Sequence, residues 1–231
     1  MALVFNGSTN TITGLAVGGL PDGTVDADTL ASGAAVPADG TITEAKLADG
    51  CVSAAKHKPN AGSGAIIQVK STSTSATTEY GSSSSYTENA FLSITELAVA
   101  ITPTASTSKI HVSFNLTGEP SENDHRMRMR VKRVITGGAT TYINAPAASN
   151  RSVTMGMFTQ GYFDNQNDST PGYFSMPSYV DSPATTSVVT YTVEYAMKHG
   201  NVTFRLNGTK DDDDNADDER AISQITVMEI A

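Results

Sequence analysis

The sequence predicts an all-β protein in which an extended N-terminal repeat stalk precedes an antiparallel β-sandwich or jelly-roll knob. Apolar and polar residues alternate along several short stretches, most clearly over 109–116, as expected for strands with one buried face. Turn signals containing Gly, Pro or Asn separate these stretches at short intervals. No segment carries helical periodicity over a useful length.

Composition and charge limit the kind of protein that this chain can be. Only 17% of its 231 residues are charged and none is Trp, which suits a surface-exposed β protein better than a helical one. The formal net charge of −9 argues against nucleic-acid binding, which needs a basic surface. The single cysteine, Cys51, cannot form an intrachain disulfide, so we expect oligomerisation to supply stability instead.

Neither a secretion signal nor membrane insertion is expected. Residues 1–10 lack a basic region followed by an apolar run, and no stretch has the length and apolar character of a membrane span. We therefore expect a protein made in a host cytoplasm but suited to an external surface. A virion component released by lysis would satisfy both conditions.

Residues 1–13 are expected to form a small docking segment. Asn6-Gly7 is a two-residue hairpin signal between the apolar stretches 3–5 and 11–13. A chain end that precedes a stalk is a natural place to dock on something larger. The alternative is a fraying terminus.

Residues 14–61 form the expected stalk and contain a repeat of ten-residue blocks, one of them shortened. Apolar residues recur at the second and seventh positions of the blocks: Leu15, Leu20, Val25, Leu30, Ile42, Leu47 and Val52. A Gly turn in most blocks excludes a long helix. Two apolar residues per block cannot form a core within one chain, so we expect several identical chains to lie side by side along a shared axis. The alternative is a disordered linker.

Residues 62–231 form the expected knob, separated from the stalk by a Pro-, Gly- and Ser-containing hinge at 59–64. We predict its strands at 66–70, 91–101, 109–116, 127–135, 153–158, 161–163, 187–197, 201–206 and 222–230. The Ser/Thr-rich stretch 71–86 is expected to be rich in turns.

Both ends of the sequence resemble fibre-like structural proteins of tailed bacteriophages, especially aquatic, cyanophage-type phages. The C-terminal stretches YVDSPATTSVVTYTVEY, GNVTFRLNG and SQITVMEIA look like a module that closes such proteins. The stalk blocks DGTV…LASG and DGTITEAKLADG are similar to decapeptide repeats of tail fibres. The resemblance implies a homotrimeric virion fibre, docked on other tail or baseplate proteins through its N-terminus, with a β-sandwich tip that touches the host. Residues 71–178 match no family and are the expected place for a receptor-binding surface.

The basic stretch 125–133 is the sharpest local feature of the sequence. On a strand, its apolar residues would face one way and its basic residues the other: Arg126, Arg128, Arg130 and Lys132. The functional hypothesis is an anion-binding strip for acidic cell-surface glycans. The alternative is a solvated outer face, or pairing with an acidic segment within the trimer, because a row of like charges is costly.

The acidic stretch 211–219 lies between two predicted strands and is expected to be a loop. Clustered carboxylates can hold Ca²⁺, but the spacing is not that of an EF-hand. We favour a solvated acidic loop and predict no metal or cofactor site. We also expect this loop and the basic stretch to meet, within or between subunits.

The stretch 158–180 holds six of the chain's 15 aromatic residues. Tyr rings stacking on sugars beside hydrogen-bonding amides and carboxylates are typical of binding surfaces. The candidate receptor-binding residues are Tyr162, Asn165, Gln166, Asn167, Asp168 and Tyr173. The alternative is that the rings pack in the core and the polar run is a plain surface loop.

No catalytic signature is present: the sequence lacks GxSxG, HExxH, a Gly-rich phosphate loop and CxxC. We therefore expect a non-enzymatic fibre protein that attaches the virion to the host cell. A capsid decoration, a head fibre or another non-adsorbing structural component is the first alternative. A glycan-cleaving tailspike is the second.

Overall fold

The computed structural model describes residues 4–6, 8, 11–13, 64–81, 87–121, 127–147, 149–158, 171–176, 178–198, 202–216 and 218–231. The chain divides into two compact units, Met1–His57 and Lys58–Ala231. We describe each unit by itself. The expected stalk, 14–61, lies outside the described residues.

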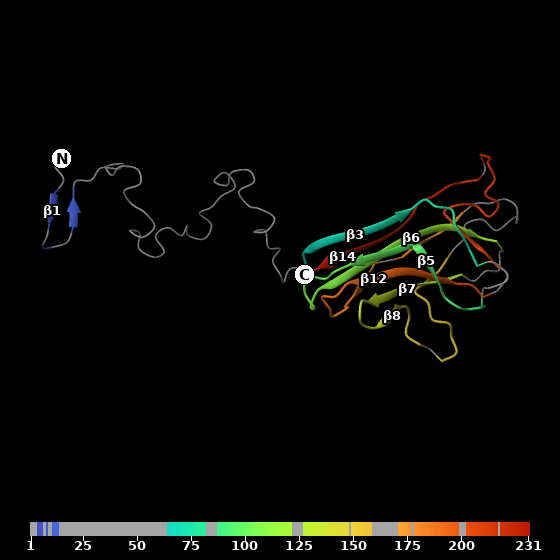
Figure 1. Ribbon diagram of the computed structural model, residues 1–231, viewed down its shortest axis with the longest axis horizontal. Coiled ribbons are helices and arrows are strands. Elements are labelled where there is room, and N and C mark those ends of the chain that lie inside the picture. The colour runs from blue at the N-terminus through green and yellow to red at the C-terminus, as the bar shows by residue number, and fades with distance from the viewer. Residues whose placement is uncertain are drawn as a thin grey trace. The chain divides into compact units, whose positions relative to one another are not determined.

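In the first unit, the described residues form a two-stranded antiparallel sheet of β1 (Val4–Asn6) and β2 (Thr11–Thr13) (Figure 1). The predicted hairpin is therefore present, but the two-residue turn predicted at Asn6-Gly7 is wrong. Asn6 pairs with Thr11, so Asn6 belongs to a strand rather than to a two-residue turn. The Asn-Gly signal competes here with the pairing of the flanking strands, which sets the register.

The second unit is built from strands, and its described residues contain no helix. The strands are β3 (Ile66–Thr74), β4 (Glu79–Tyr80), β5 (Leu92–Ile101), β6 (Lys109–Pro120), β7 (Arg128–Ile135), β8 (Thr140–Ile143), β9 (Gly156–Met157), β10 (Gly172–Ser175), β11 (Tyr179–Asp181), β12 (Val189–Ala196), β13 (Phe204–Leu206) and β14 (Ser223–Ile230). All pairings among them are antiparallel. The all-β prediction is confirmed.

The larger, seven-stranded sheet is organised around β6. One side of β6 pairs with β14, which pairs in turn with β3. The other side pairs with β11 and then with β10. Near its end, Gly118 lies between Gly172 of β10 and Leu206 of β13, so β13 continues the side occupied by β14. Beyond β13 lies β4.

The smaller sheet has five strands in the order β5-β12-β7-β8, with β9 paired to β7. Strand β12 is its centre, because it pairs along most of its length with both β5 and β7. Figure 1 shows β12, β7 and β8 side by side, with β3, β14 and β6 forming the neighbouring layer.

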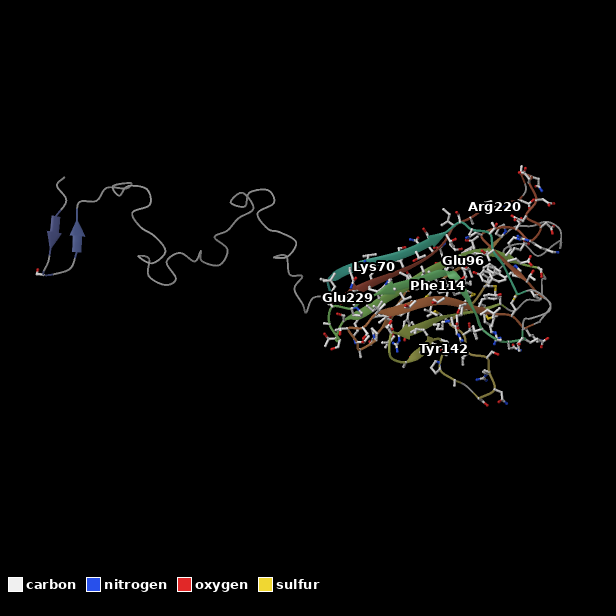
Figure 2. All side chains as sticks on the ribbon, viewed as in Figure 1. Lys70, Glu96, Phe114, Tyr142, Arg220 and Glu229 are labelled. Atoms are coloured by element: carbon white, nitrogen blue, oxygen red, sulfur yellow. The ribbon has the colours of Figure 1, made fainter. Side chains whose placement is uncertain are left out.

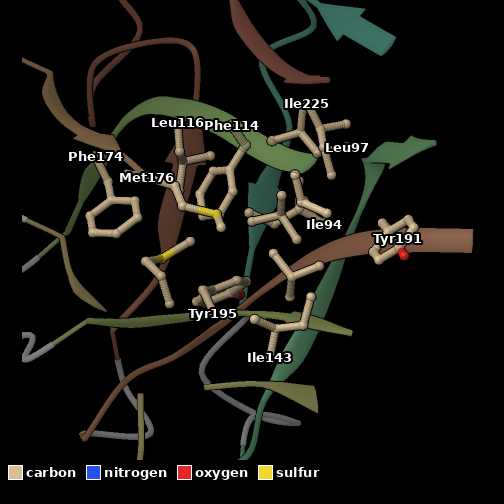
Figure 3. Close-up of a cluster of buried hydrophobic side chains, with 14 of the residues drawn as sticks. Ile94, Leu97, Phe114, Leu116, Ile143, Phe174, Met176, Tyr191, Tyr195 and Ile225 are labelled. Atoms are coloured by element: carbon tan, nitrogen blue, oxygen red, sulfur yellow. The ribbon is translucent and has the colours of Figure 1, made fainter. Parts of the chain in front are cut away.

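The hydrophobic core lies between the two sheets. Alternate residues of β6 and β14 are buried, among them Val112, Phe114 and Ile225. They meet buried residues of the smaller sheet such as Leu97 and Tyr195, as Figure 3 shows. This period-two burial is the physical reason that the alternating stretches form strands with one apolar face.

Buried polar groups at the edges of the core are hydrogen-bonded. The Glu229 carboxylate on β14 accepts hydrogen bonds from the amide of Gln68 and from the backbone N–H of Thr104. The hydroxyl of Tyr191 donates to Asp181 Oδ2 at 2.8 Å. These bonds offset the cost of removing the groups from water, and they join segments that are distant in sequence.

Most predicted strands are confirmed, with boundary shifts, and several short strands were missed. The stretch 71–86, expected to consist of turns, instead supplies the end of β3 and the whole of β4. Sequence patterns also missed β8, β10 and β11, which have only three or four residues each. The strand predicted at 161–163 lies outside the described residues.

Candidate functional site

Strand β7 presents its basic side chains on the outer face of the smaller sheet. Met129 and Val131 are fully buried in the core, and the residues that alternate with them point the opposite way, as predicted for a strand. Arg128, Arg130 and Lys132 therefore share one face. Arg126, the fourth residue of the predicted strip, lies outside the described residues.

Arg130 is held between two aromatic rings. Its guanidinium carbon lies 3.8 Å from the ring centroid of Phe91, which precedes β5, and 3.7 Å from that of Tyr142 on β8. Tyr142 reaches this position because it pairs with Lys132, the neighbour of Arg130 on the same face. Stacking on both faces fixes the planar guanidinium and leaves its N–H groups free to donate in its own plane.

Glu194 of β12 supplies the carboxylate for these cations. It lies directly opposite Arg130 in the sheet register, and its Oε2 accepts from Arg130 Nε at 2.7 Å. Its Oε1 lies 3.2 Å from Lys132 Nζ, and Ser93 Oγ donates to the same oxygen at 3.0 Å. Glu194 is only 4% exposed, so this carboxylate acts in a partly desolvated setting where charge pairing is strong.

We call the group formed by Phe91, Arg128, Arg130, Lys132, Tyr142 and Glu194 the cation–aromatic cluster. Arg128 also lies over Phe91, at 5.6 Å from the ring centroid, and donates to Asn89 Oδ1 at 2.9 Å. The cluster thus contains three cations and one carboxylate, which pairs with Arg130 and Lys132. The excess positive charge stands on a chain whose formal net charge is −9.

Among the described residues, no ion pair joins the acidic loop to the basic stretch. Asp212 instead pairs with Arg205 at 3.3 Å and with Arg220 at 2.6 Å. Arg133, the last basic residue of the stretch, pairs with Asp181 at 2.7 Å. For the described residues, the loop and the basic stretch therefore do not pair within one subunit, because the neighbouring strand already provides Glu194. Their contact between subunits stays a prediction.

The outer edge of the cation–aromatic cluster presents an ammonium group and a partly exposed ring. Tyr142 remains partly exposed although one of its faces covers Arg130, and Figure 2 shows it on β8, far from Lys70 on β3. Lys132 is the most exposed of the ion-paired cations here. An ammonium group beside an exposed ring suits a carboxylated or sulfated sugar, whose ring can lie on the Tyr142 side chain.

Of the six predicted receptor-binding residues, the structure describes only Tyr173. Tyr173 lies on β10 of the larger sheet and is 71% exposed, so the structure does not bring it together with the cations of the smaller sheet. The other five predicted residues, Tyr162, Asn165, Gln166, Asn167 and Asp168, lie outside the described residues.

Sequence reasoning missed a shallow hollow on the outer face of the larger sheet. Its volume is about 190 Å³, and it is lined by Ser113, Phe114, Asn115, Ser175, Met176, Gln224 and Thr226. Most of the lining side chains are short and uncharged. The alternation of polar residues along both β6 and β14 is visible in the sequence. The pairing of these two strands, which forms the hollow, cannot be predicted from it.

A described carboxylate of the acidic loop is hydrogen-bonded within the chain. Asp218 accepts hydrogen bonds from Thr209 Oγ1 and from the amide of Asn215. Among the residues that the structure describes, no three His, Cys, Asp or Glu side chains are placed to hold a metal ion.

Burial, followed by the nearby charges of Asp211 and Asp218, raises the pKa of the Glu119 carboxyl.

No family model matches the chain, and no curated protein matches it. Within the described part of the chain, no helix is long and apolar enough to cross a membrane.

Proposed function

We propose that this chain is a homotrimeric fibre protein on the outside of a bacteriophage virion, and that its knob attaches the virion to a host cell-surface glycan or protein. The cation–aromatic cluster is the observation that carries this proposal. It combines fixed guanidinium and ammonium donors, a partly exposed ring and an excess of positive charge on an otherwise acidic chain.

The strand order supports the jelly-roll form of the knob. Numbered along the chain, the eight principal positions are β3, β5, β6, β7, β8, the β10/β11 pair, β12 and β14. The larger sheet then has the order 1-8-3-6 and the smaller sheet the order 2-7-4-5, which is the interleaved pattern of two Greek keys. This arrangement leaves one outer face of each sheet for contacts with other molecules.

The ligand class that fits the cluster is an acidic glycan. A carboxylate or sulfate group would accept from Lys132 and Arg130, and the sugar ring would lie against Tyr142. Because the Glu194 carboxylate already neutralises part of the positive charge of Arg130 and Lys132, we expect a single knob to bind weakly. Three knobs in each fibre and several fibres on each virion would supply avidity, with the N-terminal segment docked on tail or baseplate proteins.

The test measures binding of the full chain to heparin, a sulfated glycan, and to dextran, a neutral one. The proposal predicts salt-sensitive binding to heparin and none to dextran. Lys132→Gln and Tyr142→Ser should each weaken heparin binding about fivefold or more, equivalent to about 1 kcal/mol. Lys70→Gln on exposed β3 is the matched control. Equal losses for Lys132→Gln and Lys70→Gln would contradict the proposed site.

A non-adsorbing structural component of the virion is the second candidate, such as a capsid decoration or a head fibre. It is favoured by one observation: each of the three cations already has a partner in its own chain. Adsorption of the purified protein to host cells separates the two functions. Saturable adsorption that heparin competes away supports attachment, and its absence supports a structural role.

A further inference from the structure

The middle of the outer face of the larger sheet carries no formal charge, between Lys109 at one end of β6 and the row of Glu119, Arg205 and Glu79 at the other. The register places Val69, Met228, His111 and Val180 in one row across β3, β14, β6 and β11. The next rows contain Ser71, Thr226 and Ser113, followed by Ser73, Gln224, Asn115 and Ser175. None of these is Asp, Glu, Lys or Arg, although the chain has 24 acidic and 15 basic residues. The face differs sharply from the cation–aromatic cluster.

This face also carries exposed apolar side chains. Val69 and Val180, at the two ends of the row that also holds Met228 and His111, are 53% and 52% exposed. Ile66, at the start of β3, and Ile222, just before β14, are exposed as well, as is Tyr173 on β10. Most of the large exposed apolar residues in the described part of the chain therefore belong to the larger sheet. Depletion of charge together with exposed aliphatic and Tyr side chains is typical of the core of an interface between subunits.

Several polar groups of this face are already hydrogen-bonded within the chain. Gln224 Nε2 donates to Ser71 Oγ at 2.6 Å, and Ser71 Oγ lies 3.1 Å from Thr226 Oγ1. Asn115 Nδ2 donates to the backbone oxygen of Ile222 at 3.1 Å. Polar groups that are satisfied within the chain lose less when another surface covers them, so these four side chains can be buried at low cost.

We infer that the outer face of the larger sheet is buried against other copies of this chain. Two copies that each carry a net charge of −9 repel each other, and an uncharged face is where they can approach with the least repulsion. Strand β3, which carries Val69 of this face, is also the first strand after the repeat-bearing residues 14–61 in the sequence. Identical chains are expected to run together along those residues. This inference rests on the proposed fibre and names the surface through which its knobs associate. The hollow at Ser113 and Thr226 would lie inside the contact.

The test uses cysteine labelling of the full chain, in a background where Cys51→Ser removes the native thiol. Val180→Cys and Val69→Cys place a thiol on the proposed contact. Val188→Cys is the matched control, because Val188 is also exposed, at 39%, but precedes β12 of the smaller sheet. The rate of reaction with a maleimide reagent is measured in native buffer and in urea, and the mass of each sample is measured by light scattering.

The inference predicts an oligomer in which the thiols at 69 and 180 react at least tenfold more slowly than the thiol at 188, with equal rates in urea. An oligomer in which all three thiols react at the same rate would overturn the inference and leave the proposed fibre intact. A protected thiol in a monomer would also overturn it, because the chain's own N-terminal residues would then cover the face. Adsorption to host cells reports on the proposed function separately.

Discussion

At the residue scale, Glu194 determines how the basic face of β7 is stabilised. Its buried carboxylate contacts Arg130 and Lys132, whose side chains are 16% and 27% exposed. A carboxylate in such a place pays a desolvation cost that only close, hydrogen-bonded cations can offset. Among the residues of the cluster, replacement of Glu194 should therefore have the largest effect on stability.

Replacement of Glu194 by Gln should lower the free energy of unfolding by about 3 kcal/mol, because it leaves partly buried cations without their carboxylate. Urea denaturation at one fixed protein concentration measures this loss. Glu79→Gln is the control, since Glu79 pairs with Arg205 at a similar distance, 3.2 Å, but its side chain is 47% exposed. The control should cost less than about 1 kcal/mol, and equal losses would contradict the account.

Glu119 should make stability depend on pH in the opposite direction from Glu229. Burial raises the pKa of Glu119, so its contribution is full below its unfolded pKa of about 4.3 and is lost as pH rises through the folded pKa. For Glu229, burial acts in the raising direction, but hydrogen bonds from Gln68, Ser108 and Thr104 outweigh it and lower the pKa. Its contribution is lost as pH falls.

Two variants separate these effects. In Glu119→Gln, stability relative to the native chain should improve between pH 4 and pH 7, and in Glu229→Gln it should worsen over the same interval. Thermal unfolding across that interval measures both. Parallel pH profiles for the two variants would show that the assigned environments are incorrect.

The basic face itself could be predicted from the sequence, because strand alternation places Arg128, Arg130 and Lys132 together. Its partners could not. Glu194 and Tyr142 reach Arg130 only through the register of β12 and β8 against β7, and nothing local to residues 125–133 specifies that register. The acidic loop was the obvious partner by charge, but a nearer carboxylate on the adjacent strand already fulfils the role.

At the element scale, β6 shows how tertiary contacts override local signals. The alternation of apolar and polar residues predicted a strand ending at residue 116, and Gly and Pro, which follow at 118 and 120, are uncommon inside strands. The strand instead continues to Pro120. Gly118 is needed there because a Cβ at this position would lie 2.3 Å from the backbone oxygen of Arg205 and 2.5 Å from the ring of Phe204. Glycine thus allows β13 to approach β6.

Gly118→Ala should therefore destabilise the second unit by about 2 kcal/mol or more, through overpacking against the Phe204 ring and the backbone of β13. Ser113→Ala on the same strand, where the side chain points outward, should change stability by less than about 0.5 kcal/mol. Thermal unfolding of the two variants provides the comparison. A neutral Gly118→Ala would mean that β13 does not pack closely on β6.

At the scale of the whole molecule, the two outer faces of the second unit have different chemistry. The smaller sheet carries the cation–aromatic cluster, and the middle of the larger sheet carries uncharged and apolar residues. This division fits a fibre tip in which one face of each knob contacts other copies and the other face remains open to a ligand. The sequence alone could not show it, because the faces arise from strand order, which links β3 with β14 and β5 with β12.

The mass of the full chain in solution, measured by light scattering, tests the central claim most directly. The account predicts three times the chain mass of 24.1 kDa, independent of dilution over the micromolar range. A particle of 24.1 kDa would contradict it, because a single chain leaves the repeat without partners and the uncharged face of the larger sheet uncovered.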